Sequence, residues 1–130
     1  MKVLFTVGAL LGALAVVLGA FGAHKLKMSL TPDQLQTFET GVKYQFYHVF
    51  AIALAGLLWI KFPSQGFVIS GWLFVAGVVC FSGSLYLLAN KDLLQLTSIT
   101  KIIGPITPIG GLLFIVGWVV LAVNIFKAFK

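Results

Sequence analysis

Four long apolar stretches, separated by short polar segments, dominate the sequence. They cover residues 3–23, 44–62, 67–89 and 107–126. An α-helix rises 1.5 Å per residue, so about 20 residues cross a hydrocarbon core of about 30 Å. Each stretch is about this long. The pattern therefore predicts an all-α fold, a four-span transmembrane helical bundle that forms a single integral membrane domain over residues 1–130.

The first stretch has features of both a membrane span and a secretory signal peptide. Lys2 precedes it, and small residues at 20–23 offer a cleavage site. The h-region of a signal peptide is about 7–15 residues long, however, and this run is longer, which favours a span. Gly8 and Gly12 form a GxxxG pattern that small residues extend to Gly22. Such a stripe permits close helix packing, which we expect within the chain and not at a dimer seam.

A polar segment before the second stretch predicts a helix start. Thr31 is a capping residue, Pro32 suits the first helical position, and Gln34 completes a T-x-x-Q capping box. Apolar residues then recur at three- and four-residue steps from Leu35 to Val49. We therefore predict an amphipathic interfacial segment before span two, with a candidate bend at Gly41.

The later connections contain helix-breaking residues. Pro63 lies in a polar segment that predicts a tight turn over residues 61–66. Residues 93–106 are apolar but interrupted near Gly104 and Pro105, so we expect an interfacial or partly re-entrant segment there. Thr107 is predicted to cap the last span, with Pro108 at its first helical position.

Four spans would place both termini at one membrane face and the polar ends of all spans at the other. The candidate polar site at that second face is His24, Glu39, Lys43, Tyr44, Gln45, Tyr47, His48, Ser82, Ser84, Tyr86, Asn90 and Thr107. Its densest part, FETGVKYQFYHVF, occupies residues 38–50. A polar side chain in hydrocarbon needs a partner. We therefore predict that Glu39, Tyr44, Gln45 and His48 turn inward and meet Tyr86 or Asn90.

Several of these residues also have ordinary structural explanations. Glu39 and Lys43 have the spacing of an exposed helical ion pair. Tyr44 and Tyr47 fit an interfacial aromatic belt, and the hydroxyl residues fit hydrogen bonds between helices. Each histidine most simply makes hydrogen bonds near the headgroup level.

The chain is 60% hydrophobic and 9% charged, a composition typical of membrane proteins. Its net charge of +6 comes from nine lysines against three acids. The lysines lie at the ends of apolar runs, as in interfacial anchoring, and form no basic stripe for nucleic acid. Five lysines at one face oppose four lysines and the N-terminal amine at the other, so the positive-inside rule does not select the cytoplasmic face. Cys80 is the single cysteine and is expected to be a small apolar residue.

Four segments together resemble a known family: GAFGAH at 19–24, FETGVKYQFYH at 38–48, FSGSLY at 81–86 and ITPIGGLLFIVGW at 106–118. They resemble signature segments of the YgdD-like family of small bacterial membrane proteins, over nearly the whole chain. The resemblance implies a four-helix inner-membrane protein whose biochemical role is uncharacterised. It implies no catalytic residue.

No phosphate-binding loop, Ser/His/Asp set or HExxH motif is present. Two histidines are fewer than the four ligands of a closed zinc site. We therefore expect no enzymatic activity, no metal site and no cofactor. The predicted function is a multi-pass protein of the bacterial inner membrane that contacts the lipid bilayer and binds a protein partner, further copies of itself or lipid through the polar face. The alternatives are an oligomeric small-solute or proton-coupled transporter and a metal- or haem-binding redox accessory protein.

Overall fold

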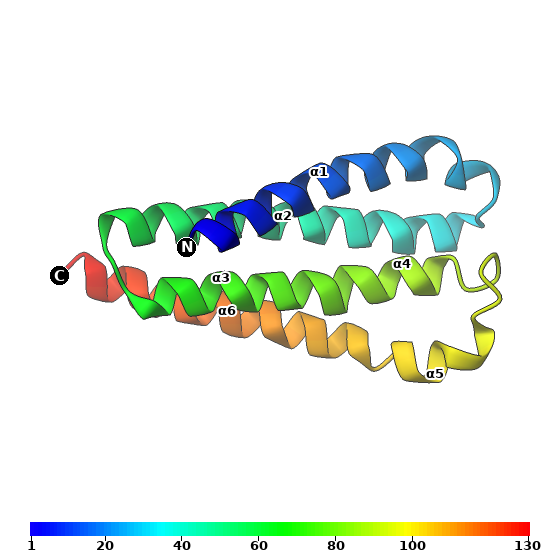
Figure 1. The fold of residues 1–130 in the computed structure, drawn as a ribbon. Coiled ribbons are helices and arrows are strands. Elements are labelled where there is room, and N and C mark those ends of the chain that lie inside the picture. The colour runs from blue at the N-terminus through cyan, green and yellow to red at the C-terminus, as the bar shows by residue number, and fades with distance from the viewer.

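The computed structural model describes residues 1–130, which form helices and no strand. Four long helical columns run antiparallel, side by side (Figure 1). They are α1 (Lys2–His24), α2 (Pro32–Lys61), the column of α3 (Gln65–Gly77), the π-helical turn η2 (Val78–Ser82) and α4 (Gly83–Ala89), and α6 (Ile106–Ala128). Both termini lie at the same end as the α2–α3 turn. The predicted all-α fold is confirmed.

The four columns do not form a closed square. The α2 helix and the α3 column lie in the centre, α1 packs against one side of this pair, and α6 packs against the other. No contact joins α1 to α6. The larger core cluster contains Leu4, Ala51, Ile52, Ala55, Phe67, Phe74, Val78, Phe114 and Leu121. A smaller cluster of Leu26, Leu30, Phe38 and Ala89 closes the end opposite the termini.

Small residues bring α1 close to α2. A Cβ added at Gly8 would lie 2.9 Å from Cγ2 of Ile52, and one at Gly22 would lie 3.0 Å from the Phe38 ring. Ala15, between them, is buried. The predicted use of the small-residue stripe within the chain is therefore confirmed.

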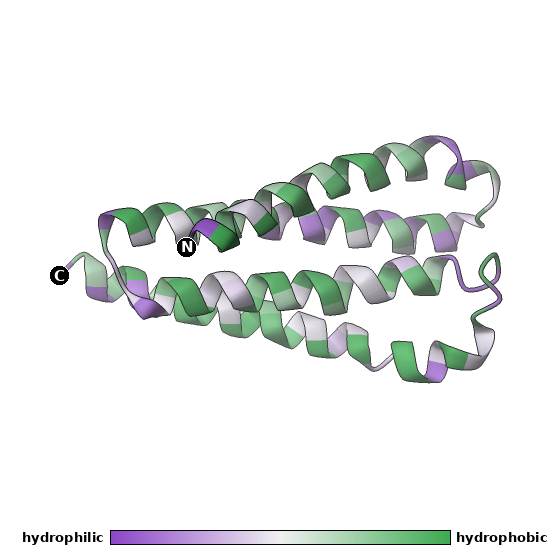
Figure 2. Ribbon diagram, viewed as in Figure 1, coloured by the Kyte–Doolittle hydropathy of each residue, from purple (hydrophilic) through white to green (hydrophobic).

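Large apolar side chains cover the outside of the molecule, and only 28 of 130 residues are buried. Figure 2 shows that apolar positions predominate along α1 and α6, whereas polar positions gather on the half of α2 near α1's C-terminal end. Three segments are long and apolar enough to cross a membrane: Lys2–Met28, Gln65–Ala89 and Thr97–Ala128. The α2 helix is not among them, although it is the longest helix, because its first half is polar. Composition thus supports three of the four predicted spans.

The predicted start of α2 is confirmed in detail. The Thr31 hydroxyl accepts a hydrogen bond from the Gln34 backbone N–H at 3.3 Å, and Gln34 Oε1 accepts one from the Thr31 N–H at 3.0 Å. The helix then continues to Lys61, so the expected interfacial segment and span two are one element. Gly41 lies within this helix, where a Cβ would be 2.7 Å from Cε1 of Tyr86. Because Gly41 has no side chain, the Tyr86 ring can pack directly against the α2 backbone.

The predicted cap of the last span is wrong. The α6 helix begins at Ile106, directly after Pro105, and no side chain caps it. Thr107 lies in the first turn, and its hydroxyl oxygen is 2.6 Å from that of Ser84. The preceding connection contains the 3-10 turn η3 (Thr97–Ile99) and the short helix α5 (Thr100–Ile103). Gly104 and Pro105 both have right-handed helical backbone angles, so α5 leads directly into α6 and the helix starts before Thr107 can act as its cap.

Candidate functional site

Gln45 is the centre of a hydrogen-bonded network inside the bundle. It is 1% exposed. Its Nε2 donates to the Leu11 carbonyl oxygen of α1 at 2.7 Å, and its Oε1 accepts from the Tyr86 hydroxyl of α4 at 2.7 Å. One amide thus joins α1, α2 and α4 and satisfies both of its ends.

Hydroxyl side chains make further bonds between helices. Ser82 donates to the Gly41 carbonyl oxygen at 2.7 Å, Ser70 donates to the Gly117 carbonyl oxygen at 3.0 Å, and Ser84 pairs with Thr107. No buried side-chain nitrogen or oxygen lacks a partner. This is the arrangement that a low-dielectric interior requires, since an unpaired polar group there is costly.

His48 is held on both ring nitrogens and is 5% exposed. Its Nδ1 lies 2.7 Å from the Tyr44 carbonyl oxygen, and Trp118 Nε1 lies 3.2 Å from its Nε2. An indole N–H only donates and a carbonyl only accepts. Nε2 must therefore be the acceptor and Nδ1 the donor, which defines a neutral imidazole protonated at Nδ1. The ring also stacks on Phe114, with centroids 3.5 Å apart and planes 7° apart.

His48 lies near the middle of α2. At 1.5 Å per residue it is about 20 Å from Lys61 and about 24 Å from Pro32 along the helix axis. The helix that carries it begins after the predicted cap Thr31 and is continuous to Lys61, so the expected interfacial segment and span two both contribute to its surroundings.

The remaining predicted site residues do not join this interior network. His24, Glu39 and Lys43 are exposed. Tyr44 is 41% exposed and Tyr47 58% exposed. The inward orientation expected for Glu39 and Tyr44 is therefore wrong, while Gln45 and His48 do turn inward. Asn90 donates to the Tyr86 carbonyl oxygen of its own helix, and not to α2.

The predicted polar site thus separates into two regions. The inner network contains Gln45, His48, Ser82, Ser84, Tyr86 and Thr107. The second region is a row of exposed residues on α2, spaced three or four apart, which we call the outer stripe: Gln36, Glu39, Lys43, Tyr47 and Phe50. Helical spacing places this row on the side of α2 opposite Gln45.

A hollow of about 380 Å³ lies beside His48, between α2, η2 and α6. We call it the His48 groove, and its lining is Tyr44, His48, Phe81, Gly111, Phe114, Ile115 and Trp118. Phe81, Phe114 and Trp118 are not among the predicted site residues. The spacing of Phe114 and Trp118, four apart on one helix face, was the available signal.

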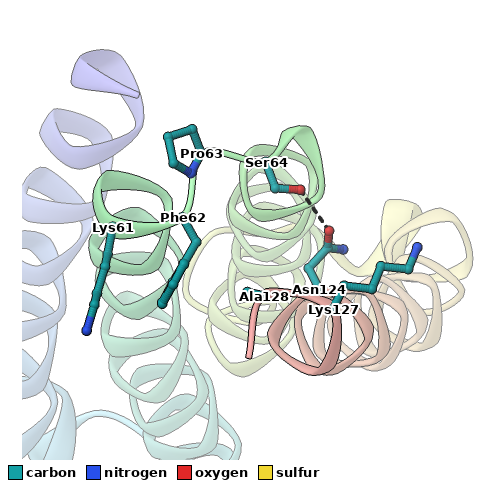
Figure 3. A pocket seen from close by; sticks show the side chains of 7 residues that line it. All are labelled: Lys61, Phe62, Pro63, Ser64, Asn124, Lys127 and Ala128. Carbon is teal, nitrogen blue, oxygen red and sulfur yellow. Dashed lines mark hydrogen bonds between the residues drawn. The ribbon is translucent and has the colours of Figure 1, made fainter. Parts of the chain in front are cut away.

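A second hollow of about 350 Å³ lies at the termini end, between the α2–α3 turn and the end of α6. There Ser64 Oγ donates to Asn124 Oδ1 at 2.9 Å and links the start of α3 to α6. Figure 3 shows that the side chains of Lys61 and Lys127 point away from each other. They therefore do not form a joint cationic site.

No three or more His, Cys, Asp and Glu side chains lie close enough together to hold a metal ion. His24 is at the end of α1, whereas His48 lies in the middle of α2. The two histidines thus do not form one site.

The helical columns, their exposed apolar surface and the interior hydrogen bonds define a small membrane-embedded protein. The chain belongs to the family described as "Protein of unknown function (DUF423)", which matches residues 18–111. It is 43% identical to the UPF0382 membrane protein YwdK of Bacillus subtilis over 128 residues, covering 98% of each chain. It is 46% identical to the UPF0382 membrane protein SSP2132 of Staphylococcus saprophyticus over 127 residues, covering 98% of this chain and 99% of that protein. No solved structure matches.

These comparisons confirm the resemblance at the level of an uncharacterised family of bacterial membrane proteins. They support membrane embedding together with the three apolar segments. They assign no reaction, ligand or partner to the inner network or to the outer stripe.

Proposed function

We propose that this protein is a non-enzymatic, four-span protein of the bacterial plasma membrane that binds another membrane protein through the outer stripe of α2. We also propose that the YgdD-like segments are signatures of this same family. In this proposal α2 is the fourth span, because it packs between α1 and the α3 column and runs antiparallel to both.

The exposed polar residues of α2 carry the proposal. A core of about 30 Å, counted from the interfacial Lys61, extends about 20 residues along α2, to about Gly41. Lys43 and Tyr47 then lie within the edge of the core, and Glu39 lies just outside it. Charged and polar groups are costly against lipid and are usually kept for a purpose. The outward faces of α1 and α6 are apolar at the same depth. A partner helix covering the stripe would remove this cost.

The charges of the outer stripe indicate what kind of partner would fit against it. Glu39 and Lys43 lie one helical turn apart and carry opposite charges. Two copies related by a two-fold axis would place each Glu39 near the other copy's Lys43. A different membrane protein with one acidic and one basic residue at this spacing would serve equally. The proposal therefore covers self-association and a distinct subunit, and it requires a protein at the stripe in either case.

The inner network favours this binding role over the transporter alternative. Its donors and acceptors are already paired with one another. A solute path would need polar groups directed at the solute, and coupling sites in transporters lie near the midplane. At this depth His48 is bonded on both nitrogens.

The test is photo-crosslinking in native membranes, with a photoreactive amino acid at Tyr47 and, as a matched control, at Leu112. These residues are 58% and 60% exposed, and both lie five or six residues inside the same membrane boundary in the proposed arrangement. We expect a discrete protein adduct from position 47 and only lipid adducts from position 112. Adducts at twice the monomer mass would identify self-association. Lipid adducts alone from both positions would refute the proposal.

A charge exchange sharpens this test. Glu39→Lys should reduce the position-47 adduct, and for self-association the double variant Glu39→Lys with Lys43→Glu should restore it, because the opposite signs are re-formed. Restoration would be absent with a distinct subunit. An adduct that Glu39→Lys leaves unchanged would contradict the role of charge.

A further inference from the structure

The His48 groove opens outward, away from the bundle interior. Tyr44, Ile115 and Trp118 line it and are 41%, 62% and 44% exposed. Its floor is formed by Phe114 of α6 and Phe81 of the π-helical turn. Because α2 and α6 are central and outer columns of a membrane-embedded protein, the opening faces the position of lipid. A ligand would therefore enter from the bilayer.

The shape of the lining selects a flat ligand. The His48 and Phe114 rings are parallel within 7°, and the Tyr44 ring is inclined to them by 21° and 27°. Three rings thus share nearly one orientation beside the hollow. Aromatic rings bind other flat rings by offset stacking or by edge-to-face contact. The volume of about 380 Å³ lies in the range of small-molecule sites.

The polar groups of the lining favour a ligand that carries a hydrogen-bond acceptor. The Trp118 N–H is already bonded to His48, and the other His48 nitrogen is bonded to the Tyr44 carbonyl. The Tyr44 hydroxyl, in contrast to that of Tyr86, bonds no protein atom. Tyr44 lies next to Lys43, within the edge of the core, and its hydroxyl is free to donate to an acceptor on a molecule bound in the groove. A carbonyl oxygen on the ligand would meet this need.

The π-helical turn is a second, independent feature at the same place. The Gly83 N–H bonds the Val78 carbonyl, five residues earlier, and the turn Val78–Ser82 carries Phe81 into the groove. Single π-helical turns cost hydrogen-bond regularity and occur frequently at functional sites. Here the turn sets the position of one wall of the groove.

We propose that the His48 groove binds a membrane-soluble molecule with a planar ring and a ring carbonyl, the chemistry of the quinones. The ring stacks beside Tyr44 and Phe114, the carbonyl accepts from the Tyr44 hydroxyl, and the apolar tail of the ligand lies in lipid. This site is separate from the outer stripe, and its test is independent of the crosslinking experiment.

The test measures quenching of Trp118 emission by decylubiquinone in lipid nanodiscs. Trp59→Phe and Trp72→Phe leave Trp118 as the single tryptophan, and both positions lie outside the groove. We expect saturable quenching, because a site fills, whereas quinone dissolved in lipid quenches in proportion to its concentration. Decanol, which has the tail without the ring, should not compete. Quenching without saturation would overturn the proposal, and equal competition by decanol would overturn the choice of a planar ring.

Two adjacent residues of α6 provide matched variants. A Cβ at Gly111 would lie 3.9 Å from the Phe81 ring, so Gly111→Leu projects into the groove without a backbone clash. Leu112 is 60% exposed and does not line the groove, so Leu112→Phe, which also adds bulk, is the control. We expect Gly111→Leu to weaken binding about tenfold or more and Leu112→Phe to leave it unchanged. If Gly111→Leu does not fold, Ile115→Phe replaces it, because it adds a ring at the groove and keeps Trp118 as the single tryptophan. Saturable quenching with unchanged affinity in the groove variant would overturn the site.

Tyr44→Phe tests the proposed hydrogen bond from the Tyr44 hydroxyl to the ligand carbonyl. It removes the hydroxyl and keeps the ring, and we expect affinity to fall about fivefold, the effect of one net hydrogen bond. An unchanged affinity would refute the acceptor part of the proposal.

Discussion

The two flanks of α2 are built in different ways. On the flank that faces α1, small residues let the two helices approach along their length, and a Cβ at Gly12 would lie 3.3 Å from Val49. On the flank that faces α6, aromatic rings meet around His48, and Phe62 packs on Phe129 just beyond the C-terminal ends of the two helices. The α1 flank is joined by close packing at its glycines and has hollows beside Gly8 and Gly19, whereas the hollow on the α6 flank is lined mainly by aromatic rings and His48.

This difference separates stability from binding. Close packing without a hydrophobic driving force is the usual basis of helix association in lipid, and the α1 flank supplies it. The α6 flank instead contains His48, the only titratable side chain among the buried residues, beside the hollow. We infer that the α1 flank holds the fold together and that the α6 flank is the one available to a ligand.

The largest expected loss of stability comes from Gly110, the first of two adjacent glycines in α6. A Cβ at Gly110 would lie 2.3 Å from the Phe81 backbone nitrogen, which cannot move without shifting the π-helical turn. We expect Gly110→Ala to lower the free energy of unfolding by about 3 kcal/mol, the upper part of the usual range for overpacking. Unfolding by SDS in mixed micelles measures it.

Gly111→Ala is the control for this prediction. The same methyl group added one residue later meets only the Phe81 ring, at an ordinary contact distance of 3.9 Å. We expect a change below about 0.5 kcal/mol, as for substitutions without strain. Equal losses at both positions would mean that the groove is closed, and the contrast between the flanks would disappear.

A smaller loss of stability is expected when the hydrogen bonds of Gln45, one of which joins α2 to α1, are removed. Gln45→Leu leaves the Leu11 carbonyl and the Tyr86 hydroxyl without their partner. We expect a loss of about 2 kcal/mol, within the range for an unsatisfied buried group. Tyr86→Phe in the same chain should cost little more, because its partner is already absent. Fully additive losses in the double variant would show that the two side chains do not interact.

Features that depend on neighbouring residues could be predicted from the sequence. The capping box of Thr31 and Gln34 lies within one helical turn, and helix spacing indicated that Gln45 and His48 share a face. The small residues from Gly8 to Gly22 likewise predicted that this helix packs closely against another helix of the same chain. Each of these follows from local backbone geometry, which the sequence specifies directly.

Features that depend on distant segments could not be predicted. The sequence predicts Thr107 as a cap, but the helical backbone of Gly104 and Pro105 starts the helix earlier. The His48 groove requires Trp118 and Phe81 from other columns. The π-helical turn has no signal in apolar periodicity, because all five of its residues, Val78–Ser82, are small or apolar.

The smallest expected effect on stability concerns Trp118, the residue that holds the α6 flank to His48. Trp118→Phe keeps an aromatic ring and removes the indole N–H that donates to Nε2. A hydrogen bond between membrane helices is worth about 0.6 kcal/mol on average, so the free energy of unfolding should fall by about this amount. Nitrogen-15 NMR of labelled histidine provides a more direct measurement. The intact protein should show Nδ1 protonated and Nε2 unprotonated, and Trp118→Phe should shift only the Nε2 resonance, because Nδ1 remains bonded to the Tyr44 carbonyl. Trp72→Phe, outside the groove, should shift neither. A protonated Nε2 in the intact protein would reverse the donor and acceptor roles of His48, and the α6 flank would then hold the imidazole by stacking on Phe114 alone.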